Sequence, residues 1–138
     1  MNDDCIFCRI IAGQVPAERV YETGGAIAFL DVMQASRGHT LVIPRLHAAS
    51  LPELPDQAVG ELFRAVKTVM EKIDRALSPK AFNVGWNHGL AAGQHVPHLH
   101  VHILPRFSPG GMGVQALGDA EGSDRAQLAS LGAAIRGA

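Results

Sequence analysis

The sequence predicts one α+β domain, with a five-stranded antiparallel sheet and helices on one face. Three observations carry this prediction: a length of 138 residues, five short strand-like segments joined mostly by turns, and one long amphipathic helical segment. A composition of 47% hydrophobic and 18% charged residues is that of an ordinary globular domain. We expect a core over residues 3–106, followed by a flexible loop and a C-terminal helix within residues 107–138.

The N-terminal third contains a short helix and three strands. Residues 5–12 favour a helix that ends at Gly13, before the Val15-Pro16 pair. Strands are expected at residues 19–22 and 26–30, and the Gly24-Gly25 pair between them is typical of a hairpin turn. Residues 40–43 form a third strand candidate, which Pro44 closes.

Residues 56–77 form the longest periodic segment. Its apolar side chains recur every three or four residues, which predicts one buried helical stripe: Val59, Leu62, Phe63, Val66, Val69, Met70, Ile73 and Leu77. Asp56 is the expected N-cap and Ser78-Pro79 the stop. Two further strands follow at residues 81–86 and 98–104, separated by a polar loop over residues 87–94 that we expect outside the core. A last helix is expected at residues 124–135.

Charge and cysteine content narrow the class of protein. A formal net charge of -1 provides no broad basic field, so neither nucleic acid nor an anionic membrane is an expected partner. The sequence contains neither the ~20-residue apolar run of a membrane span nor signal-peptide features, which predicts a cytoplasmic protein. In a reducing compartment, the Cys5-x-x-Cys8 pair favours metal binding. Redox use is the weaker interpretation, because a thioredoxin-like motif follows a strand.

Three histidines alternate along the strand predicted at residues 98–104. In a strand, His98, His100 and His102 share one face, while Leu99, Val101 and Ile103 share the other and can pack on the long helix. Charged imidazoles about 7 Å apart repel by roughly 2 kcal/mol, which favours neutral rings at pH 7. Neutral imidazoles are nucleophiles or metal ligands. A catalytic zinc site with an open position is therefore an alternative, although a third histidine in line is poorly placed for tetrahedral closure.

The run His98-Leu99-His100-Val101-His102-Ile103-Leu104 resembles the defining motif of the histidine triad (HIT) superfamily. Four further stretches are similar to the Hint-like branch and its bacterial-type hydrolases, over roughly residues 3–106: Cys5 to Ile11, Ala28 to Asp31, Gly38 to Pro44 and Ala92 to Gln94. The resemblance implies a HIT-like fold and a homodimer in which the sheet continues into the second copy.

The resemblance also implies roles for individual residues. His100 would attack the α-phosphate of a nucleotide to give a nucleotidyl-histidine that water cleaves, and His102 would orient or hydrogen-bond the phosphate. His98 completes the triad. Phosphate contacts are implied for Asn87, Gly93 and Gln94. His95 departs from the family's usual Ser or Thr, which donates to the leaving-group oxygen, and a histidine donates there in the right tautomer.

Nucleoside recognition and a metal site follow from the same resemblance. Asp31 matches the carboxylate that accepts from both ribose hydroxyls, and the base-pocket positions are matched by Phe7, Ile10, Val15 and Phe29. A closed, structural Cys₂His₂ zinc site is implied for Cys5, Cys8, His47 and His98, with no organic cofactor. His39 matches a further histidine behind the triad.

The implied activity is hydrolysis, or transfer, at the α-phosphate of an adenosine or guanosine nucleotide, such as a nucleoside phosphoramidate, releasing a nucleoside monophosphate. Two alternatives stay open at this point. One is a dinucleoside polyphosphate hydrolase that uses the same nucleophile with another leaving-group pocket. The other is a non-catalytic nucleotide-binding scaffold protein.

Overall fold

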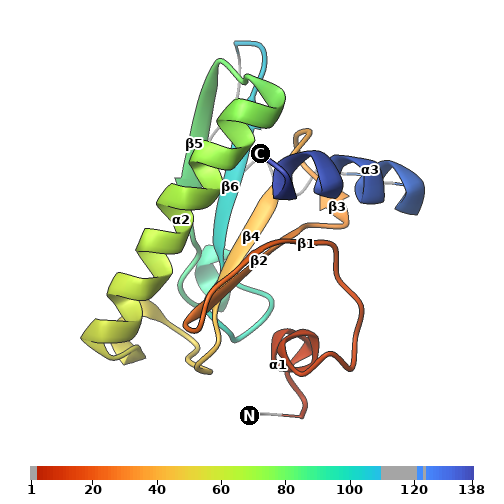
Figure 1. Ribbon diagram of the computed structural model, residues 1–138. Coiled ribbons are helices and arrows are strands. Elements are labelled where there is room, and N and C mark those ends of the chain that lie inside the picture. Colours follow the sequence, from red (N-terminus) through yellow and green to blue (C-terminus); the bar gives the residue numbers. More distant parts are fainter. Residues whose placement is uncertain (1–2, 110–120, 123) are drawn as a thin grey trace.

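The computed structural model describes residues 3–109, 121–122 and 124–138 and confirms the predicted α+β architecture. Its main sheet is antiparallel throughout, with strand order β1-β2-β4-β6-β5. Figure 1 shows these strands beside the long helix α2. The elements of the main domain are α1 (Ile6–Ile11), β1 (Arg19–Glu22), β2 (Ala26–Leu30), β4 (Thr40–Pro44), α2 (Asp56–Leu77), β5 (Ala81–Gly85), β6 (Val101–Arg106) and α3 (Arg125–Arg136).

The predicted hairpin and long helix form where the local sequence indicates. β1 and β2 pair across the Gly24-Gly25 turn. Helix α2 ends at Ser78, which adopts the left-handed conformation with φ 50° and precedes a proline. The prediction of Asp56 as N-cap was wrong by one position, because Pro55 is the cap residue and Asp56 is the first helical residue, where its charge still complements the helix dipole.

The expectation of helices on one face of the sheet was wrong for α1. Strand β2 is buried along its whole length and alternates between two cores. Ala28 and Leu30 join the core beneath α2. Ile27 and Phe29 join a second core with α1, on the opposite face. Figure 1 shows α1 well apart from α2. The continuous apolar run of this strand is therefore the signal of a sheet covered on both sides.

The histidine-bearing strand begins later than predicted. β6 starts at Val101 rather than at His98, and it continues to Arg106. Before that point the backbone N–H of Leu99 donates to the carbonyl of Ala48 at 2.8 Å, outside the sheet. Leu99, Val101 and Ile103 nevertheless lie in the α2 core, as predicted.

Helix α3 covers the start of the sheet. Asp124 caps it by accepting from Ala126 N at 2.7 Å, and Arg136 near its end bonds Glu18 at 3.1 Å. A small second sheet, which the sequence did not predict, pairs β3 (Met33–Gln34) with β7 (Glu121–Gly122). The flexible loop expected after residue 107 lies largely outside the described residues. Among those described, no helix combines the length and apolarity that a membrane crossing requires.

Two one-turn 3-10 helices complete the described elements. One spans Leu51–Glu53, ahead of α2, and the other spans Leu90–Ala92 within the predicted polar loop.

Candidate active site

A mainly apolar cavity of about 390 Å³ lies between α1, β2 and the segment that leads into β6. Two histidines and one carboxylate provide its charged and nucleophilic groups: His100, His102 and Asp31. The predicted base-pocket residues all line it, namely Phe7, Ile10, Val15 and Phe29. Further lining residues that the sequence did not single out are Ile6, Pro16, Ala17, Leu30, Val32, Leu41 and Val96.

The His100 ring is held by a backbone hydrogen bond. Its Nδ1 lies 2.8 Å from the carbonyl oxygen of His98, and since a carbonyl only accepts, Nδ1 carries the proton. The neutral ring then has its lone pair on Nε2. The ring of Phe7 packs edge-on against it, with centroids 5.0 Å apart. His100 is therefore a fixed imidazole with one unprotonated nitrogen.

Burial keeps the row of histidines neutral. It lowers the pKa of His98 to about 4 and that of His102 to about 3, and it also lowers the pKa of His100. Repulsion from His100 adds to the pKa lowering of His102 and His98. The neutral state predicted from the sequence is thus supported, but loss of hydration is a larger cause than the repulsion that suggested it.

The three triad histidines lie on the side of the sheet that faces α1, as predicted, but only two of them line the cavity. His102 lines the cavity beside His100, with ring centroids 5.0 Å apart, whereas His98 is fully buried and lies outside the cavity lining. His98 precedes the regular strand and faces Cys5 and Cys8 at the start of α1 instead of the cavity. A three-histidine metal site is therefore not formed by this triad.

His98 belongs instead to a cluster with Cys5, Cys8 and His47. Its Nδ1 lies 3.4 Å from Cys5 Sγ and 3.1 Å from His47 Nδ1. Cys8 Sγ lies 3.3 Å from His47 Nδ1 and 3.6 Å from His98 Nδ1. Zn–S distances of about 2.3 Å and Zn–N distances of about 2.0 Å place tetrahedral ligands roughly 3.3–3.8 Å apart, so these four atoms fit one zinc ion.

A second contact fixes the tautomer of His98. Its Nε2 lies 2.9 Å from the Pro44 carbonyl oxygen and carries the proton that this acceptor requires. The Nδ1 lone pair therefore points at the sulfurs, the arrangement common to histidines that bind metals. Burial raises the pKa of the Cys5 thiol, so a cation is needed to hold this sulfur as a thiolate.

The loop after β5 meets the sequence prediction only in part. Asn87, Gly93, Gln94 and His95 do not line the cavity. Gln94 is buried, contrary to the expectation for this loop: its side chain accepts from Gly89 N at 2.8 Å and donates to two carbonyls, at 2.8 and 3.0 Å. In this structure its amide supports the loop from inside.

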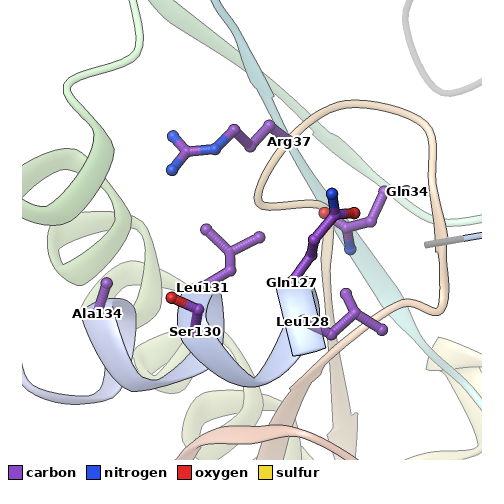
Figure 2. A pocket seen from close by; sticks show the side chains of 7 residues that line it. All are labelled: Gln34, Arg37, Gln127, Leu128, Ser130, Leu131 and Ala134. Atoms are coloured by element: carbon purple, nitrogen blue, oxygen red, sulfur yellow. The ribbon is translucent and has the colours of Figure 1, made fainter. Parts of the chain in front are cut away.

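A second hollow, of about 560 Å³, separates α3 from the loop between β2 and β4 (Figure 2). Figure 2 shows Gln34 and Arg37 on one side of it and Gln127, Leu128 and Leu131 of α3 on the other. No histidine or cysteine lines it. Gln34 connects the hollow to the active site, because its amide donates to the carbonyls of Asp31 and His39 at 2.6 and 2.8 Å.

Comparison with known proteins identifies relatives of this chain. The family model described as HIT domain matches residues 12–109. "Protein hit" of Bacillus subtilis is 43% identical over 108 residues, 78% of this chain and 74% of the relative. The adenosine 5'-monophosphoramidase hnt1 of Schizosaccharomyces pombe is 42% identical over 102 residues, covering 74% of each protein.

Among solved structures, a Zn-bound histidine triad family protein from Mycobacterium smegmatis superposes with a TM-score of 0.81 and 32% identity, over 96% of this chain and 91% of that one. That protein is a zinc-bound member of the histidine triad family. With the family model covering most of the chain and the same fold in the solved structures, this protein belongs to the HIT domain family.

Proposed function

We propose that this chain hydrolyses or transfers at the α-phosphate of a purine nucleotide through a covalent nucleotidyl-histidine on His100. The observation that carries the proposal is the His100 ring itself, fixed through Nδ1 at 2.8 Å from a carbonyl, neutral through burial, and lining the cavity that contains Asp31. The resemblance to an adenosine 5'-monophosphoramidase supports a nucleotide substrate. An intact, oriented nucleophile argues against a purely binding or scaffold protein.

Two displacements at phosphorus make up the proposed reaction. In the first, the Nε2 lone pair of His100 forms a bond to the α-phosphorus while the bond to the leaving amine or oxygen breaks, and the leaving group takes up a proton from the solvent or from a donor such as His95. In the second, water attacks the same phosphorus and gives up a proton to the solvent, the P–Nε2 bond breaks, and a nucleoside monophosphate and neutral His100 are released. His102, beside His100, would hydrogen-bond the phosphate.

The cavity walls match a nucleoside. The aromatic and aliphatic side chains of Phe7, Ile10 and Phe29 offer stacking and apolar contact to a base. Asp31 follows β2 and is partly exposed, and its two oxygens can accept from both hydroxyls of a ribose. In the same scheme His95, an exposed residue, would donate to the leaving group, and Asn87, Gly93 and Gln94 would supply phosphate contacts after the loop adjusts to substrate.

We also propose that the Cys₂His₂ cluster (Cys5, Cys8, His47 and His98) binds a structural zinc ion. The four donor atoms lie at tetrahedral spacing and leave no ligand position open, so the metal has a folding role rather than a catalytic one. It would hold α1, and with it Phe7 and Ile10, against the segment that carries His100.

A homodimer is part of the proposal. Strand β5 is an edge of the sheet, and Val84 on it is 39% exposed, so a second copy could continue the sheet there. Sedimentation equilibrium, which measures the mass of the protein in solution, distinguishes a monomer from a homodimer.

The substrate class is tested by turnover. Adenosine phosphoramidate should be cleaved to AMP with a higher kcat/KM than diadenosine polyphosphates. The opposite order would favour the dinucleoside polyphosphate hydrolase. Nucleotide binding without cleavage of either compound would favour the scaffold protein.

A further inference from the structure

A second set of metal-ligand side chains lies at the inner end of the cavity. His39 Nε2 is 3.1 Å from His102 Nδ1 and 3.7 Å from Asp31 Oδ2, and the three donor atoms all lie within 4.8 Å of one another. A transition metal with ligands at about 2.0–2.2 Å brings neighbouring donor atoms roughly 3.0–3.6 Å apart. The two distances from His39 Nε2 are close to that spacing, and the Asp31 and His102 donor atoms lie within 4.8 Å of each other.

The surroundings favour His39 as a ligand through Nε2. Its ring is 1% exposed, and Nδ1 lies 3.3 Å from the backbone N of Ala35 and 3.2 Å from the Met33 carbonyl oxygen. In the tautomer that binds a metal, Nδ1 donates to this carbonyl. That hydrogen bond leaves the lone pair on Nε2, directed at His102 and Asp31. A buried histidine whose outer N–H is bonded to a backbone carbonyl is the usual arrangement behind a metal ligand.

The loop that carries Asp31 and His39 is braced independently. The Gln34 side chain donates to the carbonyls of both residues and accepts from Gly38 N at 2.8 Å. Asp31 Oδ1 accepts from Met33 N at 2.9 Å, which turns Oδ2 toward His39. Asp31 and His39 are thus held in position before any ion arrives, and His102 is held by strand β6, which reduces the cost of binding one.

We propose that Asp31, His39 and His102 bind a first-row divalent transition metal such as Co²⁺ or Zn²⁺. Two imidazoles and one carboxylate suit such ions, and Asp31 and His102 border the cavity, so further coordination positions open toward it. This site is separate from the Cys₂His₂ cluster, with which it shares no residue. If Asp31 binds ribose as proposed above, the metal and a nucleotide compete for the same carboxylate.

The test uses Co²⁺ alone as the probe. Protein carrying one equivalent of zinc is dialysed against Co²⁺, and bound cobalt is counted by elemental analysis and visible absorption. The wild-type chain should take up one further equivalent, without the thiolate-to-cobalt absorption that the Cys₂His₂ cluster would give. His39→Gln and Asp31→Asn should each weaken this uptake at least about tenfold, as expected for the loss of one ligand.

His88→Gln is the matched control, because His88 is exposed and belongs to neither cluster. It should bind cobalt as the wild type does, and circular dichroism should show that all three variants are folded. No cobalt uptake by the zinc-loaded wild type, or equal uptake by His39→Gln and His88→Gln, would overturn the site. AMP should displace this cobalt. Retention of cobalt under saturating AMP would overturn the competition and count against Asp31 as the ribose ligand, while leaving the metal site intact.

Discussion

Histidine has different roles in the Cys₂His₂ cluster and in the cavity. In the cluster, His98 is fully buried and directs Nδ1 at two sulfurs and a second imidazole. Two residues later, His100 fixes Nδ1 on a carbonyl and keeps Nε2 for the cavity. The backbone carbonyl bonded by each ring therefore decides which nitrogen retains its lone pair, and with it whether the histidine is a closed ligand or a nucleophile.

Burial alone does not distinguish the two regions. It lowers the pKa of His98 and of His102 to about 4 and about 3, so both are neutral at pH 7. What differs is access: the four cluster atoms face one another, while His100 and His102 face a hollow. The comparison predicts that substitutions in the cavity alter chemistry, and that substitutions in the cluster alter stability.

Replacing the nucleophile should have the largest effect. His100→Asn keeps a polar group of similar size but removes the attacking nitrogen, so turnover should fall on the order of 10⁴-fold or more, with nucleotide binding changed little. His102→Asn should cost less, because a hydrogen-bonding group supplies only part of the barrier reduction. Steady-state kinetics with adenosine phosphoramidate measures the loss of turnover in each variant.

Mass spectrometry of quenched enzyme is the direct check on the covalent step. Wild-type protein should show a nucleotidyl adduct on His100, and His100→Asn should show none. Near-normal hydrolysis by His100→Asn, or an adduct on another residue, would contradict the mechanism.

The second-largest effect is expected from removing a ligand of the Cys₂His₂ cluster, which should reduce the stability of the fold. Cys8→Ser removes one ligand from a closed site, which should lower the free energy of unfolding by roughly 3–5 kcal/mol, as for other metal losses. Denaturant unfolding followed through Trp86, the only tryptophan, measures it. A strong chelator should destabilise the wild type similarly and Cys8→Ser hardly at all. If the purified protein contains no zinc, and Cys8→Ser leaves the free energy of unfolding unchanged, the cluster is not a zinc site.

The sequence predicted more of the cavity than of its surroundings. Phe7, Ile10 and Phe29 meet as expected because they match family positions on a helix and a strand that form locally. The resemblance assigned His98 both to the triad and to the Cys₂His₂ cluster, and in the structure it lies in the cluster and outside the cavity lining. For this residue, the sequence missed only that the regular strand begins at Val101. His39 and His102 are 63 positions apart. The resemblance implied that His39 lies behind the triad, and the pairing of β4 with β6 shows that His102 is the ring it approaches.

A smaller, selective effect is expected at the ribose position. Asp31→Asn replaces one acceptor oxygen by a donor, so nucleotides with an intact diol should bind about tenfold more weakly. Dideoxy analogues lack the hydroxyls and should lose little. Titration calorimetry with both ligand types, on wild type and variant, separates these cases. Equal losses for the two would count against a diol contact.

The smallest predicted effect is a pH response that stays nearly flat. An imidazole with the ordinary pKa of about 6.5 would be only one-tenth neutral near pH 5.5, and kcat/KM would fall about tenfold from its value at pH 7.5. Burial lowers the pKa of His100 below that value, so the neutral nucleophile persists as the pH falls, and its acid limb lies lower. The substrate should be a nitrophenyl ester of AMP, because its phenolate leaves without needing a proton. We expect kcat/KM to drop less than about threefold over this range. A full tenfold fall centred near pH 6.5, in protein that Trp86 fluorescence shows to be folded, would mean that the ring is more hydrated than its position beside Phe7 indicates.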